Sequence, residues 1–223
     1  MPQLDNNVRY LQIAFNQDLG TLQRILPLIP PSERILIEAG TPLIKLEGMR
    51  AIRAIRMRWT GHIVADLKAS DGAVEEVDMA RRAGATAATV LGNAPSETLN
   101  FFIDRCKTLN MLSMIDLLGV VDPLDILRPL KQAPDIIVIH RGRDEENTQG
   151  KMIRYRQINR IRSKYDCLIS AAGGVDLREA RSAIFNGANI VVVNIVRPGD
   201  GWTGISTNAD ITQLSRQFLE TIS

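Results

Sequence analysis

Val64-Ala-Asp-Leu-Lys-Ala-Ser-Asp71 is the stretch that decides the fold, because an apolar run changes here into a cluster of charges. The run begins at His62, and Asp66, Lys68 and Asp71 follow it within six residues. Burying an unpaired charge is costly, so such charges are rare inside a strand. Two interpretations fit these residues alone. The cluster is either an ion pair on the surface or a chemical centre at the carboxyl end of a buried strand.

The rest of the chain repeats this order of an apolar run followed by a helical segment. The strands that we expect cover 11–15, 34–38, 62–66, 86–91, 111–116, 135–140, 167–171 and 189–194. The helices that we expect cover 18–28, 47–59, 72–83, 96–109, 152–164, 176–187 and 208–222, and one more begins at 122–123. Capping residues, helical spacing and closing glycines support these helices. Loops are expected at 39–42, 141–150 and 197–204.

The repeat indicates the fold class. The strands are apolar throughout rather than alternating, which is typical of a sheet that is covered on both faces. Strands that alternate with helices through short turns form a parallel sheet with right-handed crossovers. Eight such pairs in 223 residues predict an α/β fold, a single (β/α)8 TIM barrel over residues 1–223 with no domain boundary. A doubly wound open sheet is the alternative.

Composition narrows the class of protein. The chain is 45% hydrophobic and 23% charged with a net charge of +2, so we expect no nucleic-acid partner. No apolar run approaches the about 18 residues of a membrane span, and the first residues lack a signal-peptide layout. Cys106 and Cys167 have neither metal-site spacing nor a disulfide framework, and we expect both in the core. A reducing cytoplasm is the expected location.

The carboxyl ends of barrel strands meet at one mouth, so polar residues at these ends are expected to share a pocket. Glu38 and Asp66 end neighbouring strands, and two adjacent carboxylates repel unless a cation or proton lies between them. Oxygen ligands with open positions suit Mg²⁺, although Lys68 competes as an ion-pair partner. The polar residues at the expected mouth are Asn16, Glu38, Asp66, Lys68, Asp71, Asp116, His140, Arg141, Arg143, Gly173, Gly174 and Asn194.

Two features of this mouth point to a phosphorylated substrate and to proton transfer. Gly173-Gly174 and the loop after Asn194 occupy the usual phosphate position of such a barrel, although many ordinary turns contain a Gly-Gly pair. Arg143 and Arg197 are placed to add charge-assisted hydrogen bonds. His140 ends its strand, which favours catalysis over a core role.

Six motifs at the strand ends carry a resemblance to a known family. They are Glu38-Ala-Gly-Thr-Pro-Leu-Ile44, Asp66-x-Lys68-x-x-Asp71, Thr89-Val-Leu-Gly92, Asp116-Leu-Leu-Gly119, His140-Arg-Gly142 with Arg143, and Ala172-Gly-Gly174. Over nearly the whole chain they resemble the orotidine 5'-phosphate decarboxylase suprafamily. The resemblance is greatest to its branch of 3-hexulose-6-phosphate synthases and 3-keto-L-gulonate-6-phosphate decarboxylases, and greater to the synthases.

This resemblance implies a Mg²⁺-dependent aldolase or lyase that acts on a pentulose or hexulose phosphate through an enediolate. The activity it favours joins formaldehyde to ribulose 5-phosphate; a keto-gulonate-phosphate decarboxylase and a catalytically drifted phosphate-binding barrel are the alternatives. It implies that Glu38 and Asp66 hold Mg²⁺ and that Lys68 stabilises the enediolate. His140 would then transfer a proton, with Arg143 close to it.

The resemblance further implies a homodimer in which Asp71 reaches into the partner's site. It places the phosphate at the backbone around Gly173, Gly174, Asn194 and Ile195. Three positions depart from the family's pattern. Asn16 stands where a carboxylate is usual, Ala69 where the synthases usually have Thr, and Asn194-Ile195 where strand eight usually ends in glycine. Asn16 remains a candidate substrate-binding residue, because its amide donates and accepts hydrogen bonds.

Overall fold

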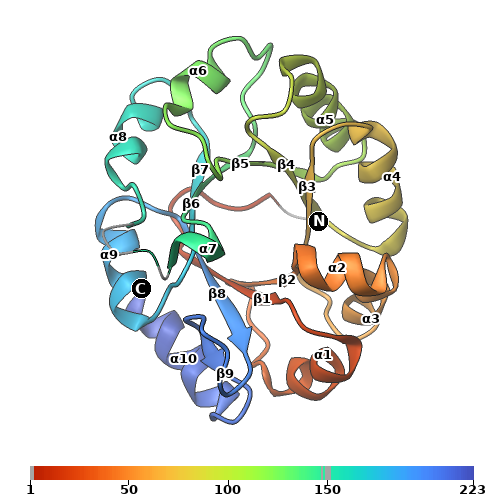
Figure 1. Ribbon diagram of the computed structural model, residues 1–223, viewed down its shortest axis with the longest axis vertical. Helices are drawn as coiled ribbons and strands as arrows, with labels where there is room; N and C mark the ends of the chain where they lie inside the picture. The colour runs from red at the N-terminus through yellow and green to blue at the C-terminus, as the bar shows by residue number, and fades with distance from the viewer. Residues whose placement is uncertain (1–2, 147, 149–151) are drawn as a thin grey trace.

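The computed structural model describes residues 3–146, 148 and 152–223. In this part of the chain eight parallel strands follow one another around a barrel, which the pairing of β1 with β8 closes (Figure 1). The predicted (β/α)8 barrel is therefore confirmed, and the open sheet is excluded. The strands are β1 (Tyr10–Phe15), β2 (Ile35–Ala39), β3 (Ile63–Ala69), β4 (Ala87–Leu91), β5 (Leu112–Asp116), β6 (Ile136–His140), β7 (Leu168–Ala172) and β8 (Ile190–Val196).

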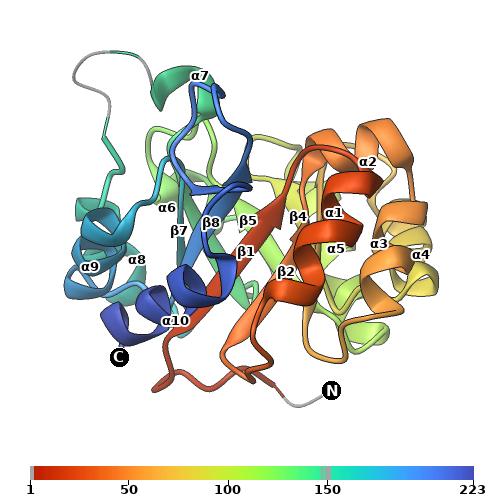
Figure 2. The same ribbon diagram turned by 90° about the horizontal axis from the view of Figure 1, so that it is seen from below.

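Helices surround the barrel on its outer face, apart from the short α7 (Arg143–Glu146), which lies above the mouth (Figure 1 and Figure 2). Their hydrophobic faces cover the sheet, as expected for strands that are apolar on both sides. They are α1 (Leu19–Ile25), η1 (Leu26–Leu28), α2 (Thr41–Glu47), α3 (Arg50–Arg56), α4 (Ala73–Ala83), α5 (Ser96–Thr108), α6 (Pro123–Leu127), α7 (Arg143–Glu146), α8 (Arg156–Arg162), α9 (Leu177–Phe185) and α10 (Ile211–Thr221).

The alternation of side chains along each strand builds two hydrophobic cores. In β1, Leu11 and Ile13 point outward and pack under the helices, whereas Tyr10 and Ala14 point into the barrel. Leu4 joins the inner core, and the segment that carries it passes beneath the barrel (Figure 2). The amino-terminal end of the barrel is thus filled with apolar side chains, which leaves the carboxyl end for polar residues.

The segment 39–42 was predicted as a turn, and the structure corrects this. Thr41 begins α2, with Pro42 in the first turn, where proline is favoured because it has no N–H to donate. Gly48 ends α2 at a φ of 59°, so the helix predicted over 47–59 is confirmed only as the shorter α3, and α2 is a separate helix before it that was not predicted.

Two further elements were not predicted. Arg143–Glu146 form α7 inside the segment 141–150, which was predicted as a loop; 147, 149 and 150 lie outside the described residues. After β8, β9 (Ile205–Ser206) pairs with the last two residues of that strand. β8 therefore runs to Val196, two residues beyond the predicted end.

Two expectations from composition can be compared with the structure. Cys106 and Cys167 are buried and unpaired, as predicted for core residues. In the described ranges, every helix is too short or too polar to cross a bilayer.

Candidate active site

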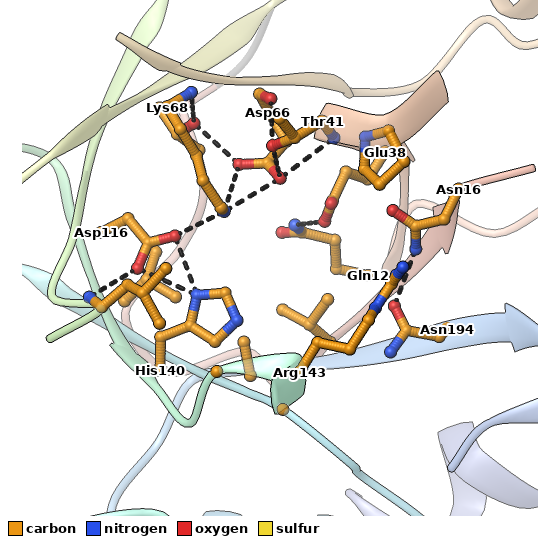
Figure 3. A pocket seen from close by; sticks show the side chains of 18 of the residues that line it. Gln12, Asn16, Glu38, Thr41, Asp66, Lys68, Asp116, His140, Arg143 and Asn194 are labelled. Carbon is orange, nitrogen blue, oxygen red and sulfur yellow. Dashed lines mark hydrogen bonds and ion pairs between the residues drawn. The ribbon is translucent and has the colours of Figure 1, made fainter. Parts of the chain in front are cut away.

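A cavity of about 410 Å³ opens at the carboxyl ends of the strands (Figure 3). Its size suits a small metabolite, and strands on all sides contribute polar groups to it. Most of the predicted residues meet here, together with Gln12, Thr41 and Thr89, to which the sequence analysis assigned no role. The polar and glycine residues of its wall on which the site depends are Gln12, Asn16, Glu38, Thr41, Asp66, Lys68, Thr89, Asp116, His140, Arg143, Gly173 and Asn194.

A bulge in β3 places the two central charges at this mouth. Ala65 pairs with Ala88 and Ala69 pairs with Val90, so three residues of β3 lie opposite a single residue of β4. Lys68 within the bulge has a φ of 48°, a conformation that costs a residue with a side chain about 1–2 kcal/mol. The strand was predicted to end at Asp66. In the structure it continues to Ala69.

The Lys68 ammonium joins two carboxylates from different strands. Its Nζ lies 2.9 Å from Asp66 Oδ1 and 2.7 Å from Asp116 Oδ2 (Figure 3). Burial alone would lower the pKa of Lys68, but the two carboxylates outweigh burial and raise it. Lys68 therefore carries a fixed positive charge inside the cavity. The ion pair that was expected as the alternative does form, between Lys68 and Asp66, but it lies in the wall of the cavity rather than on the outer surface.

Both carboxylate oxygens of Asp66 accept hydrogen bonds. Thr41 donates to Oδ2 from its hydroxyl at 2.7 Å and from its backbone N–H at 3.2 Å. The Thr89 hydroxyl donates to Oδ1 at 2.8 Å. Both threonines belong to motifs of the sequence, but only the packing of α2 and β4 against β3 brings them to Asp66. They hold the carboxylate in one orientation.

Asp116 links Lys68 to His140. His140 Nδ1 lies 2.8 Å from Asp116 Oδ2, and the backbone N–H of Leu118 donates to Oδ1 at 2.9 Å. Burial alone would raise the pKa of Asp116, but His140 and Lys68 hold it well below its usual range. Burial opposes a charge on His140 as well, and the Asp116 carboxylate overcomes this and raises the His140 pKa.

The tautomer of His140 follows from these contacts. An ionised Asp116 accepts a hydrogen bond, so the proton lies on Nδ1 and Nε2 remains for the cavity, toward which it points in Figure 3. The strand-end position had singled out Asp116 without giving it a role. The structure makes it the residue that positions both the lysine and the histidine.

Glu38 is a buried carboxylate on the opposite wall. Gln12 Nε2 donates to Glu38 Oε2 at 2.5 Å. Burial and, after it, the charge of Asp66 raise the pKa of Glu38 to about 7. A signal for Gln12 existed in the sequence, because it is an amide inside an otherwise apolar strand.

The donor set here fits a hard divalent cation. The available metal ligands are all oxygen atoms, from the carboxylates of Glu38 and Asp66 and the side-chain carbonyl of Gln12. Gln12 Oε1 is buried and has no hydrogen-bond partner in the described part of the chain. The described residues contain no group of three or more His, Cys, Asp or Glu placed to hold a metal. A cation here would therefore take part of its coordination from water or substrate, as Mg²⁺ commonly does.

The raised pKa of Glu38 predicts a pH-dependent gain in stability for Glu38→Gln. At pH 8 the folded metal-free protein holds Glu38 ionised, a cost that the unfolded chain does not incur, so the variant should be more stable by about 1–3 kcal/mol. At pH 5 Glu38 is already protonated in the folded protein and the difference should nearly vanish. Urea unfolding with a chelator at both pH values measures this, with Glu33→Gln as an exposed control. An equal difference at both pH values would contradict it.

Asn16 and Asn194 form a neutral wall between β1 and β8. Asn16 Nδ2 donates to Asn194 Oδ1 at 3.0 Å (Figure 3). Gly40 makes room for the pair, since a Cβ at this glycine would lie 2.1 Å from Asn16 Oδ1. The two departures from the family's pattern are therefore partners, and neither adds a charge.

The glycine pair after β7 lies beneath an arginine. Gly173 lines the cavity, but a Cβ at Gly174 would lie 2.1 Å from Arg141 Nη2, and this nitrogen donates to Gly173 O at 3.0 Å. At β8, Ile195 is fully buried, and its carbonyl accepts a hydrogen bond from Gln17. Gly174 and Ile195 thus lie outside the wall of the cavity in the described chain.

Asp71 does not meet the other predicted residues. It is exposed, it accepts a hydrogen bond from the N–H of Gly72 at 2.9 Å, and it is absent from the described wall of the cavity. Within one chain Asp71 therefore stands apart from the site.

Comparison with known sequences agrees with this architecture. The model of the orotidine 5'-phosphate decarboxylase / HUMPS family matches residues 9–194. A bifunctional enzyme Fae/Hps of Methanothrix thermoacetophila is 36% identical over 212 residues, which are 94% of this chain and 52% of the relative. One of Methanosarcina barkeri is 36% identical over 216 residues, 96% of this chain and 53% of the relative. The chain thus spans about half the length of these curated relatives.

Solved structures show the same fold. A 3-hexulose-6-phosphate synthase from Salmonella typhimurium superposes with a TM-score of 0.79 at 24% identity, covering 96% of this chain and 98% of that one. KGPDC from Streptococcus mutans gives a TM-score of 0.73 at 18% identity, covering 97% of this chain and 98% of that one. With the family match over most of its length and the carboxylate–lysine centre in place, the chain belongs to the orotidine 5'-phosphate decarboxylase / HUMPS family.

Proposed function

We propose that the protein is a carbon–carbon lyase of the aldolase type, which joins formaldehyde to ribulose 5-phosphate or runs the reverse reaction. The observation that carries this proposal is the chain of contacts from Asp66 through Lys68 and Asp116 to His140. The relatives named Fae/Hps and the resemblance to 3-hexulose-6-phosphate synthase support the choice of substrate.

The proposed reaction needs a stabilised oxyanion. Removing a proton from the carbon beside a ketone makes an enediolate, whose negative charge must be met by a cation that is already in place. Lys68 has this property, because two carboxylates hold its ammonium in one position. The bulge of β3 keeps it there without reorganisation during the reaction.

The proton is moved by His140. Nε2 takes the proton from the substrate carbon, and the ionised Asp116 on Nδ1 stabilises the imidazolium that results. The raised pKa of His140 makes this nitrogen a stronger base than a solvent-exposed histidine.

Mg²⁺ is part of this proposal, with Glu38 and Asp66 as its ligands. When bound, it would supply positive charge to the oxygens of the substrate. The buried carboxylate of Glu38 and the unpartnered Gln12 Oε1 support this position.

The test is direct. Purified protein with Mg²⁺ and ribulose 5-phosphate should consume formaldehyde and form a hexulose phosphate, which phosphate-ester chromatography detects. If saturating substrates give no loss of formaldehyde, the aldolase proposal is wrong. If phosphate esters still bind, the drifted binding barrel gains support.

A second candidate reaction is decarboxylation of a 3-keto sugar-acid phosphate, which forms the same kind of enediolate. One observation favours it: the Asn16–Asn194 wall is neutral, so it does not repel the carboxylate of such a substrate. A panel that contains both substrates separates the reactions, because one consumes formaldehyde and the other releases CO₂.

Asn16→Asp is expected to preserve or raise turnover with formaldehyde and ribulose 5-phosphate. The Asn194 amide can rotate to donate to the new carboxylate, which restores the charge that the family's pattern has at this position. Initial rates of the purified variant check this, with Asn159→Asp on the outer surface as control. A loss of the native activity would show instead that the neutral pair is adapted to another substrate.

We also propose a homodimer in which Asp71 enters the partner's cavity. Its exposure, and its position outside the described wall of the cavity in its own chain, support this arrangement. Lys68→Ala and Asp71→Ala should each be inactive alone, and mixing them should restore activity, because a mixed dimer has one intact site. Sedimentation checks the dimer, and an absence of complementation in mixed dimers would contradict the role of Asp71.

A further inference from the structure

A second cavity of about 310 Å³ adjoins the first, beside the loops that follow β1 and β8. Asn16, Arg143 and Asn194 line both cavities, so they form the boundary between them. Arg143 is the charged member of this boundary. In Figure 3 its side chain extends from α7 toward the Asn16–Asn194 pair.

Trp202 holds Arg143 at this boundary. The guanidinium carbon lies 4.8 Å from the centre of the indole ring, and α7 and the loop after β8 both rise above the barrel mouth (Figure 2). Stacking on an aromatic ring fixes the plane of a guanidinium and leaves its N–H groups for another partner. In the described part of the chain no carboxylate pairs with Arg143.

Arg197 is the other cation in the wall of the second cavity, and its guanidinium already has a carboxylate partner. Arg197 forms an ion pair with Asp18 through Nη2, and its backbone N–H donates to Asp200. Arg143 thus combines a fixed orientation with unused donors. Beside it, Asn194 Nδ2 makes no hydrogen bond to the described residues and is a second donor.

Part of the backbone position expected for the phosphate is occupied by the protein itself. The end of β8 pairs with β9, the carbonyl of Ile195 accepts from Gln17, and Arg141 covers Gly174. An anion that enters the mouth therefore meets side-chain donors at the boundary of the two cavities.

We propose that Trp202 is a positioning residue, which holds the Arg143 guanidinium where it binds the phosphate group of the substrate together with the Asn194 amide. The identity of the sugar rests on the proposed function. The binding of a phosphate monoester follows from the donors themselves.

The test compares Trp202→Ala with Trp202→Phe in the full chain, using ribulose 5-phosphate, unphosphorylated ribulose and inorganic phosphate as probes in calorimetry. Trp202→Ala should weaken binding of ribulose 5-phosphate about tenfold, and Trp202→Phe, which keeps a ring under the guanidinium, less than about threefold. Binding of unphosphorylated ribulose should not change. Phe185→Ala, which removes an exposed aromatic ring elsewhere, is the matched control.

A double-mutant cycle gives the second readout. If Trp202 acts through Arg143, then Trp202→Ala should have almost no further effect on phosphate binding in an Arg143→Ala background. If the wild-type protein is active with formaldehyde and ribulose 5-phosphate, Trp202→Ala should raise the KM for ribulose 5-phosphate with little change in kcat. A purely structural role would weaken phosphorylated and unphosphorylated sugars alike and would add to the effect of Arg143→Ala.

The outcomes separate this inference from the proposed function. Binding of phosphate or its ester that depends on Trp202, without consumption of formaldehyde, overturns the proposed reaction and supports the inference. Turnover of formaldehyde with unchanged phosphate binding in Trp202→Ala overturns the inference alone. A wild-type protein that binds neither inorganic phosphate nor ribulose 5-phosphate also overturns it.

Discussion

Lys68→Ala is expected to lower kcat/KM by about 10³-fold, because in the proposed reaction the substrate oxyanion would then develop without a preplaced cation. The same change should destabilise the fold by about 3–5 kcal/mol, since Asp66 and Asp116 remain as buried carboxylates that have lost their shared partner. Activity in the presence of Mg²⁺ and urea unfolding measure the two effects. A loss of both activity and stability distinguishes Lys68 from a residue that serves only catalysis or only the fold.

Lys45→Ala is the matched control, because Lys45 is exposed and lies outside the cavity wall. It should change neither measurement. Should Lys68→Ala fail to fold, Lys68→Met keeps most of the side-chain volume without the charge, and circular dichroism confirms the fold before the assay. Turnover within about threefold of wild type in a folded Lys68 variant would remove Lys68 from the mechanism, because such a ratio is only about 0.65 kcal/mol of barrier.

Asp116→Asn is expected to reduce kcat by about 10²-fold or more, since the amide no longer stabilises the imidazolium of His140. It should also move the pH profile. Asp116 raises the pKa of His140 against the effect of burial, so its loss lowers that pKa. If the reaction needs the neutral base, the acidic limb of kcat/KM then moves to lower pH.

Rates measured between pH 5 and 9 check both parts of this prediction. Asp125→Asn on the exposed surface of α6 provides the control and should leave the profile unchanged. A fall in kcat with an unmoved acidic limb would show that His140 is not the group that titrates in the reaction. Asp116 would then act on Lys68 alone, through the contact of 2.7 Å.

The fold was predictable because its pattern is local and repeated. Each strand is an apolar run that is long enough to cross the barrel, and α1, α6, α9 and α10 each begin at an aspartate that caps the helix. The errors arose where local signals conflict. Thr41-Pro42 looked like a turn, although proline also begins helices, and the four residues of α7 are too few for a periodic pattern.

The members of the site were predictable for a related reason. In a parallel barrel, all strands point the same way, so a polar residue at a strand end must lie at the mouth. This rule found Glu38, Asp66, Asp116 and His140 from position alone. It missed Gln12, which lies deeper in its strand and reaches the cavity only because its side chain points inward.

The sequence by itself determined the barrel and most of the charged residues at its mouth, because hydrophobic periodicity and strand direction are properties of neighbouring residues. Only the tertiary structure decided the partners within that set. Lys68 reaches Asp116, 48 positions away, through the bulge of β3, and Arg143 meets Trp202 where α7 lies beside the loop after β8. Such contacts depend on register and loop packing across the whole barrel, which no stretch of eight residues encodes.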